Sequence, residues 1–300
     1  MSKRTNKLLT YALVFIALLL LFLLVYQPEA PPKAETQPRL QEAPELVAKV
    51  VYHLNRSSTL LQASLVRGAE RLEGQEEVLA IRDALLNLSN SRELSEGSFP
   101  RELREALRSY ATLADAAYNM YLASSVLDEV RGNVSRVLRL VLECKAYEAL
   151  AEWVKIEEKV DTALKYVLQA VTDLSEVNTS ALLSPNHAEL VDEAAARASS
   201  VAETLGEVRK LMNIVSKYGS LLDELCRSTR RGCKCGLSSE ALSAIMREVS
   251  ALEPSRAGPY SYEISRVKAL VARAMQRGVE GGKGIGGGEG AGYGEPPSDD

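Results

Sequence analysis

The sequence predicts an all-α protein, with one transmembrane helix near the N-terminus followed by an elongated extracellular helical bundle that contains long antiparallel helices. An uncharged apolar run, helical spacing of apolar residues after it, and the lack of strand-like alternation all favour this fold class. We expect five segments: a cytoplasmic N-terminus (1–7), a transmembrane signal-anchor helix (8–26), a spacer (27–44), the bundle (45–277) and a disordered tail (278–300).

The predicted anchor is the run LLTYALVFIALLLLFLLVY from Leu8 to Tyr26, which contains no charged residue. A helix of this length matches the hydrocarbon core of a bilayer, about 30 Å thick. Lys3, Arg4 and Lys7 precede the run, whereas acidic and basic residues are mixed after it, so the positive-inside rule places the N-terminus in the cytoplasm. A cleaved signal peptide is the alternative, but its apolar region is usually shorter and precedes a better cleavage site. Either way, the rest of the chain is exported.

The segments that flank the bundle have unusual compositions. The spacer is rich in proline and should be stiff and extended, which holds the bundle away from the membrane. The tail from Gly278 is rich in glycine, ends in acidic residues and should be disordered. Its Gly282-x-Gly284-x-x-Gly287 pattern lacks the preceding strand and following helix of a dinucleotide site, so we expect no nucleotide to bind there.

Helical periodicity divides the first part of the bundle into four predicted helices. The first has an apolar seam over residues 47–72, and the second has its apolar residues at 78–86. The third is expected to begin at Pro100 and to end at Gly132. A long fourth helix should cover residues 133–174, with its first residue, an asparagine, as the N-cap.

The predicted fifth helix has the most regular seam in the chain, over residues 191–226. Ser184 and Pro185 supply its N-cap and first turn. A second apolar stripe beside the seam widens the face, which favours a bundle over an isolated coiled coil. Two shorter helices are expected at residues 239–252 and 262–277.

Four cysteines, Cys144, Cys226, Cys233 and Cys235, follow the anchor, and an exported domain favours disulfides. A bridge between Cys233 and Cys235 is unattractive because only one residue separates them. We therefore expect Cys144 to pair with the Cys233/Cys235 loop or with Cys226. If the fourth and fifth helices are antiparallel about a turn near Leu182, Cys144 lies 38 residues before the turn and Cys226 lies 44 after it, a reasonable register. A four-thiolate zinc site is the alternative, although the usual ligand spacing is missing.

Four N-glycosylation sequons also follow the anchor, where this composition would yield about one by chance. Their asparagines are Asn55, Asn87, Asn133 and Asn178. The excess favours a glycosylated surface, but each asparagine also has a local structural explanation: Asn133 suits a helix N-cap, and Asn178 follows a helix end. Asn55 lies inside a helical pattern and is the weakest candidate acceptor.

The sequence indicates no catalytic, cofactor or metal site. The two histidines, His53 and His187, lie in no E-x-x-H pair, so we expect them to pack or to face solvent. No serine lies in a nucleophile elbow. The chain has 36 Lys and Arg against 40 Asp and Glu with no basic cluster, which argues against nucleic-acid binding. A small-molecule pocket between helices remains an alternative, with the following candidate aromatic residues: Tyr110, Tyr118, Tyr121, Tyr147, Trp153 and Tyr166.

These observations predict a non-enzymatic structural or interaction protein of the cell envelope, integral to the cell membrane by a single span. It would act as a scaffold, an adhesion protein or an accessory subunit, and would bind a protein partner or further copies of itself through helical faces. A ligand-sensing ectodomain is the first alternative; because the cytoplasmic segment is too short for an output domain, its signal would pass through a membrane partner. An exported enzyme is the second alternative.

Overall fold

The computed structural model describes residues 40–68, 74–91, 94, 101–231 and 238–282, and every regular element in these ranges is a helix. The all-α prediction is therefore confirmed. The predicted transmembrane helix lies outside the described residues, as do residues 27–39 of the spacer and 283–300 of the tail. Residues 40–44, which were expected to be extended, instead form the turn η1 and the start of α2, where Pro44 occupies the first turn. In the ranges given above, no helix combines the length and the apolar character needed to cross a membrane.

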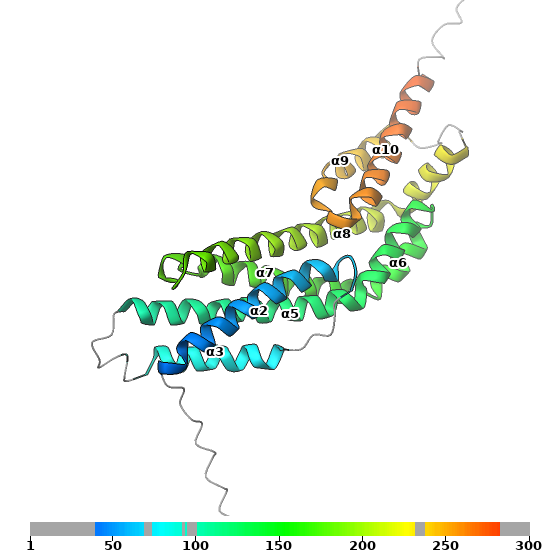
Figure 1. The fold of residues 1–300 in the computed structure, drawn as a ribbon. Coiled ribbons are helices and arrows are strands. Elements are labelled where there is room, and N and C mark those ends of the chain that lie inside the picture. The colour runs from blue at the N-terminus through cyan, green and yellow to red at the C-terminus, as the bar shows by residue number, and fades with distance from the viewer. Residues whose placement is uncertain (1–39, 69–73, 92–93, 95–100, 232–237, 283–300) are drawn as a thin grey trace, which may run out of the picture. The chain divides into compact units, whose positions relative to one another are not determined.

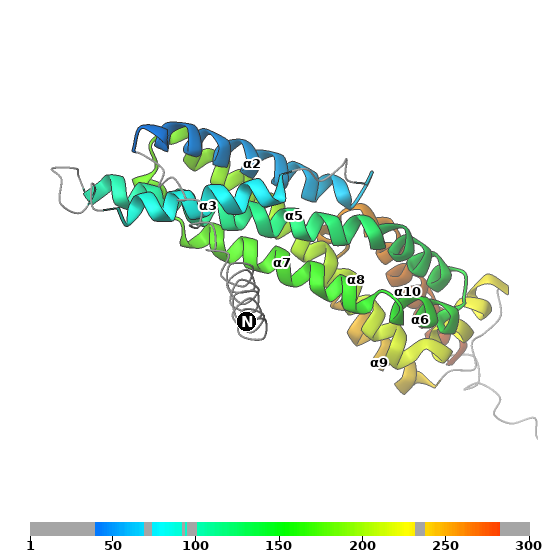
Figure 2. The same ribbon diagram turned by 90° about the horizontal axis from the view of Figure 1, so that it is seen from below.

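The first described helices pack along one long helix. After the short turn η1 (Leu40–Glu42), α2 (Ala43–Ser64) and α3 (Gln75–Ser89) both lie against α5 (Arg101–Leu142), as Figures 1 and 2 show. The first part of the predicted seam is confirmed, because Val47, Leu54 and Leu61 are all buried. The helix does not extend to residue 72 as expected: α2 ends at Ser64, and the chain turns at Gly68, which has a left-handed backbone with φ of 90°. The predicted second helix is also confirmed.

α5 does not end at Gly132, and Asn133 is not an N-cap. The helix continues through both residues to Leu142, and both are exposed on its surface. The reason is tertiary: the apolar seam continues on both sides of the glycine, with Val130 before it and Val134 and Val137 after it, all buried. A mid-helix glycine costs about 1 kcal/mol relative to alanine. Burying two valine side chains contributes about 3 kcal/mol or more, which outweighs that cost.

The single long helix predicted over residues 133–174 is also wrong. The chain instead forms the end of α5, the short helix α6 (Ala146–Val154) and then α7 (Glu157–Glu176). The first break lies at Cys144, which has a left-handed backbone with φ of 65°. The second lies at Ile156, which has a non-helical φ of −120°. The side chain of Ile156 is buried in the core.

The predicted fifth helix is confirmed as α8 (Pro185–Arg231), which follows the turn η2 (Thr179–Ala181). α7 and α8 lie side by side and run antiparallel about that turn (Figure 1). The helical backbone of α8 is interrupted at Tyr218, where φ is −125° and ψ is 19°. The apolar seam before this residue, including Val191, Val201 and Val208, is buried.

The last described segment packs against α8. It contains α9 (Ser239–Ser250), the short turns η3 (Pro254–Arg256) and η4 (Gly258–Tyr260), and α10 (Ser261–Gly282). Both predicted C-terminal helices are therefore present. α10 continues five residues past the expected end at Arg277, so the predicted disordered tail does not begin at Gly278; residues 283–300 lie outside the described ranges.

Candidate functional site

A disulfide joins Cys144, just after α5, to Cys226 near the end of α8. The two Cα atoms are 5.5 Å apart, the residues are 82 positions apart in the sequence, and both side chains are buried. This is one of the two frameworks expected from the sequence. The remaining two cysteines, Cys233 and Cys235, lie outside the described residues. A four-thiolate zinc site is not compatible with this bond, which occupies two of the four sulfurs.

Cys144 occupies a backbone position that usually belongs to glycine. The end of α5 forms a Schellman motif: the Lys145 N–H donates to the Leu140 carbonyl oxygen at 3.1 Å, and the Cys144 N–H donates to the Val141 carbonyl oxygen at 3.3 Å. The residue at the left-handed position of this motif is normally glycine, because a Cβ atom is disfavoured there. Cys144 adopts this left-handed backbone despite its Cβ atom, and its side chain forms the disulfide with Cys226 of α8.

The N-terminus of α6 is held by α8 beside the disulfide. Asp223, which is buried, accepts a hydrogen bond of 2.7 Å from the backbone N–H of Ala146. Gly219 lets the two helices approach, because a Cβ atom added there would lie 3.3 Å from the Cβ atom of Ala146. We call Cys144, Ala146, Gly219, Asp223 and Cys226 the cysteine junction. It fixes the part of α8 beyond Tyr218 against α6.

The left-handed backbone at Cys144 leads to a prediction that separates backbone strain from the disulfide. In a Cys226→Ala background, Cys144→Gly should be more stable than Cys144→Ala by about 1 kcal/mol, because both lack the bond but only glycine tolerates the observed φ. Urea denaturation of the two double variants measures the difference. Equal stabilities would show that the backbone relaxes once the bond is absent.

Both histidines contact buried tyrosines of α5. The Nδ1 atom of His53, in α2, lies 3.1 Å from the hydroxyl oxygen of Tyr121, and its Nε2 atom lies 3.4 Å from a carboxylate oxygen of Glu77 in α3. The His53 side chain is only 3% exposed. Gly74, which precedes α3 with φ of 119°, lies against the ring: a Cβ atom there would come within 2.8 Å of the ring carbon Cε1.

The second contact closes the turn between α7 and α8. The hydroxyl of Tyr110 lies 2.6 Å from Nδ1 of His187 and accepts a 3.0 Å hydrogen bond from the backbone N–H of Leu183. Tyr110 and Tyr121 are eleven residues apart, about three turns of helix, so both lie on the same face of α5. Burial raises the pKa of both phenols, that of Tyr121 to about 12. Both therefore remain protonated at neutral pH and act here as structural hydrogen-bonding groups.

Burial lowers the pKa of His53 below its usual value of 6.5. Arg56 and Lys49 add to this effect, whereas Glu77 opposes it without overcoming the loss of solvation. The neutral imidazole is therefore favoured more strongly in the folded chain than in the unfolded chain.

This shift predicts that the bundle loses stability as the pH falls below about 6.5. The unfolded chain takes up a proton at His53 near pH 6.5, while the folded chain takes it up only at a lower pH, so protonation favours unfolding. Urea denaturation between pH 5 and 7.5 measures the slope. His53→Gln should reduce it, because this variant lacks the imidazole whose pKa is lowered in the folded chain. An unchanged slope in the His53 variant would contradict the assignment.

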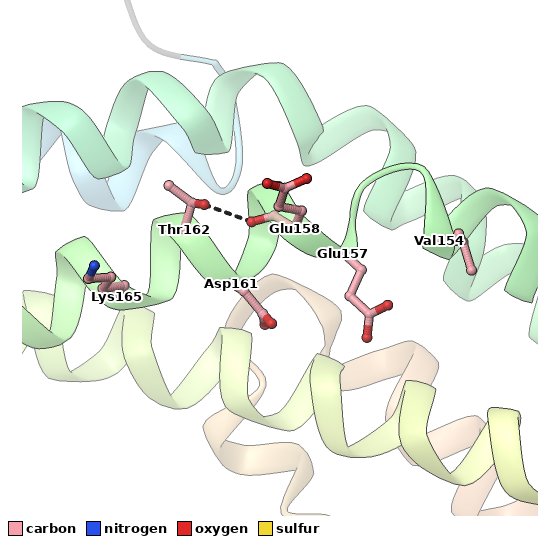
Figure 3. Close-up of a pocket in the computed structure, with 6 residues that line it drawn as sticks. All are labelled: Val154, Glu157, Glu158, Asp161, Thr162 and Lys165. Carbon is pink, nitrogen blue, oxygen red and sulfur yellow. Dashed lines mark hydrogen bonds between the residues drawn. The ribbon is translucent and has the colours of Figure 1, made fainter.

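An open hollow lies beside the break between α6 and α7 (Figure 3). Its volume is about 470 Å³, and it is lined by Val154, Glu157, Glu158, Asp161, Thr162 and Lys165. We call it the acidic hollow. Asp161 pairs with Arg209 of α8 at 3.2 Å through one oxygen, while its other oxygen is buried without a hydrogen-bond partner. A second hollow of about 270 Å³ shares Glu158 and Thr162 and extends to Val126 and Glu129 of α5.

The solvent side of α6 next to the acidic hollow exposes two large apolar side chains. Tyr147 is 67% exposed and Val154 is 72% exposed. Seven residues separate them, about two turns of helix, so they lie on the same side. Tyr147 and Val154, together with the acidic hollow, make up what we call the α6 surface. The sequence does not indicate this surface. It depends on the break between α6 and α7, whereas the sequence predicts one uninterrupted helix over residues 133–174.

The aromatic residues proposed for a ligand pocket do not converge on one cavity. Tyr110 and Tyr121 are fully buried in the core, Trp153 is also buried, and Tyr147 is exposed. None of the six aromatic residues lines the two hollows described above. In the described part of the chain, no group of three or more metal-binding side chains comes together.

The four candidate glycosylation sites have different surroundings. The asparagine residue itself is exposed in all four sequons. Asn55, Asn87 and Asn133 lie within α2, α3 and α5, whereas Asn178 lies in the connection after α7.

Comparison with known proteins gives no relative from which a role could be transferred. No protein-family model, no curated protein sequence and no solved structure matches this chain significantly.

Proposed function

We propose that this chain is a single-span membrane protein with its N-terminus in the cytoplasm, whose helical bundle lies outside the cell and acts as a non-enzymatic structural or interaction protein. The membrane anchor is the apolar run of residues 8–26. The disulfide between Cys144 and Cys226 supports export, because such bonds persist mainly in oxidising compartments. The α6 surface supports the interaction role.

Two exposed side chains of α6 support the interaction role. Tyr147 and Val154 expose large apolar groups on one side of a short helix, and the carboxylates of Glu157, Glu158 and Asp161 follow directly. An apolar patch bordered by charge is the usual composition of a protein contact surface. The cysteine junction holds α6 on its other side, through Ala146, so the α6 surface is presented in a fixed geometry. A protein that offers apolar and basic side chains would complement it.

Two exposed valines provide a matched test. Val154 is 72% exposed on the α6 surface, and Val66 is 59% exposed in the turn after α2. Full-length chain is cross-linked in its native membranes, solubilised in detergent and purified. We expect wild type to carry a partner or a second copy, Val154→Asp to reduce recovery of that complex at least about tenfold, and Val66→Asp to leave it unchanged.

Two results would contradict the proposal. A chain that is recovered without any cross-linked species argues against an interaction role. Equal recovery with both aspartate variants would show that the contact surface is not the one on α6. Circular dichroism of each purified variant should match wild type, because both valines are exposed and neither substitution affects the core.

A further inference from the structure

The four sequons lie in different local structures: three are in α-helices, and the fourth is in the connection after α7. In α2, the Asn55 carbonyl oxygen accepts hydrogen bonds from the hydroxyls of Ser58 at 3.0 Å and Thr59 at 2.8 Å. The hydroxyl residue of that sequon, Ser57, is 0% exposed and donates to the Leu54 carbonyl oxygen. An enzyme that must reach both the asparagine and the hydroxyl cannot do so without unfolding the middle of α2.

The sequons of α3 and α5 have the same difficulty. Ser89, which completes the sequon of Asn87, is buried and donates a 2.8 Å hydrogen bond to the Leu86 carbonyl oxygen. Asn133 and Ser135 both lie in the middle of the continuous α5 helix. In both cases the whole sequon is part of an α-helix.

The fourth sequon is open. α7 ends at Glu176, and Asn178 has an extended backbone with φ of −76° and ψ of 91°. Asn178, Thr179 and Ser180 are all exposed. The hydroxyl of Ser180 donates a 2.6 Å hydrogen bond to the carboxamide oxygen of Asn178, so the two groups that define the sequon lie side by side at the surface. An enzyme that binds this segment would have to open only the single 3-10 turn η2 and no α-helix.

We propose that Asn178 carries an N-linked glycan and that Asn55, Asn87 and Asn133 of the folded chain do not. The inference rests on the proposed export, because the saccharide donor would be a lipid-phosphate-linked sugar on the outer side of the membrane. The carboxamide nitrogen of Asn178 attacks the anomeric carbon of the sugar and forms the C–N bond. The bond between that carbon and the phosphate oxygen breaks, its electron pair leaves with the lipid phosphate, and the nitrogen loses one proton. No oxidant or reductant is required.

The position of the glycan fits the local surface. The connection between α7 and α8 exposes Leu183, an apolar residue, five residues after Asn178. A polar saccharide at Asn178 would cover this part of the hairpin turn and keep it soluble. It would not touch the Tyr110 hydroxyl, which already binds the Leu183 backbone from the inner side.

Peptide mapping by mass spectrometry of the full chain from native-host membranes tests the proposal. We expect a saccharide mass on the peptide that contains Asn178 and none on those containing Asn55, Asn87 or Asn133. Asn178→Gln and Ser180→Ala should both remove the added mass. Ser180→Thr, which preserves the sequon, and Asn87→Gln should both keep it.

Recovery of an unmodified Asn178 peptide would overturn the inference, as would a saccharide on any of the three helical sequons. Labelling of intact cells with a membrane-impermeant reagent distinguishes this failure from a failure of export. A labelled chain with an unmodified Asn178 refutes only the glycosylation site. A chain that is protected from the reagent refutes the proposed export, and the glycan with it.

Discussion

Replacing Cys144 and Cys226 with alanine should lower the free energy of unfolding by about 4.5 kcal/mol. The two residues are 82 positions apart, and the chain-entropy model gives this value for a loop of that length, because the bond restricts the unfolded chain. For a domain of this size the loss corresponds to a melting temperature lower by about 10–15 °C. Thermal and urea denaturation of the full chain, with and without reductant, measure both quantities.

The reduced wild type is the internal control for this variant. Reductant should shift the wild type toward the double alanine variant and leave the variant itself unchanged. Non-reducing peptide mapping of the exported protein must also recover Cys144 linked to Cys226. A link from Cys144 to Cys233 or Cys235, or a melting temperature insensitive to reductant, would refute the junction described above.

The sequence predicts the turn between α7 and α8 and the long α8 helix, because the seam of α8 is a long, regular pattern. In two straight antiparallel helices, Cys226 would lie six residues out of line with Cys144. The structure brings their Cα atoms within 5.5 Å, and the straight-helix register does not apply, because the helix expected over residues 133–174 is broken at Cys144 and at Ile156. The sequence leaves two partners open for Cys144. Spacing alone cannot choose between Cys226, which lies near the end of the helix, and the Cys233/Cys235 loop, which follows it.

The helix boundaries and the histidine contacts were not predictable in the same way. Gly132 carries a strong local stop signal, yet the burial of Val134 and Val137 continues α5 through it. His53 meets a tyrosine 68 residues away and His187 meets one 77 residues away, so no local spacing connects them. One signal was available: Tyr110 and Tyr121 share an apolar helix face, and buried tyrosine hydroxyls need hydrogen-bonding partners.

Gly74→Ala should destabilise the bundle by about 3 kcal/mol, because it combines an unfavourable backbone with overpacking. Gly74 has φ of 119°, and an added Cβ atom would lie 2.8 Å from the Cε1 atom of His53. His53 cannot easily give way, since its ring nitrogens contact Tyr121 and Glu77. Urea denaturation at pH 7.5 measures the loss. The variant should also show a weaker dependence of stability on pH, because the displaced imidazole is less buried.

Gly132→Ala is the matched control, and its expected effect has the opposite sign. This glycine lies in the continuous α5 helix with no atom within 4 Å of an added Cβ, so alanine meets no obstacle. Alanine is favoured over glycine in a helix interior by about 1 kcal/mol, and the variant should be more stable than wild type by about that amount. If α5 really ended at residue 132, as the sequence alone suggests, the substitution would destabilise the chain. The sign of this measurement therefore tests the continuity of α5, and its contrast with the loss expected for Gly74→Ala tests the specific role of Gly74 beside His53.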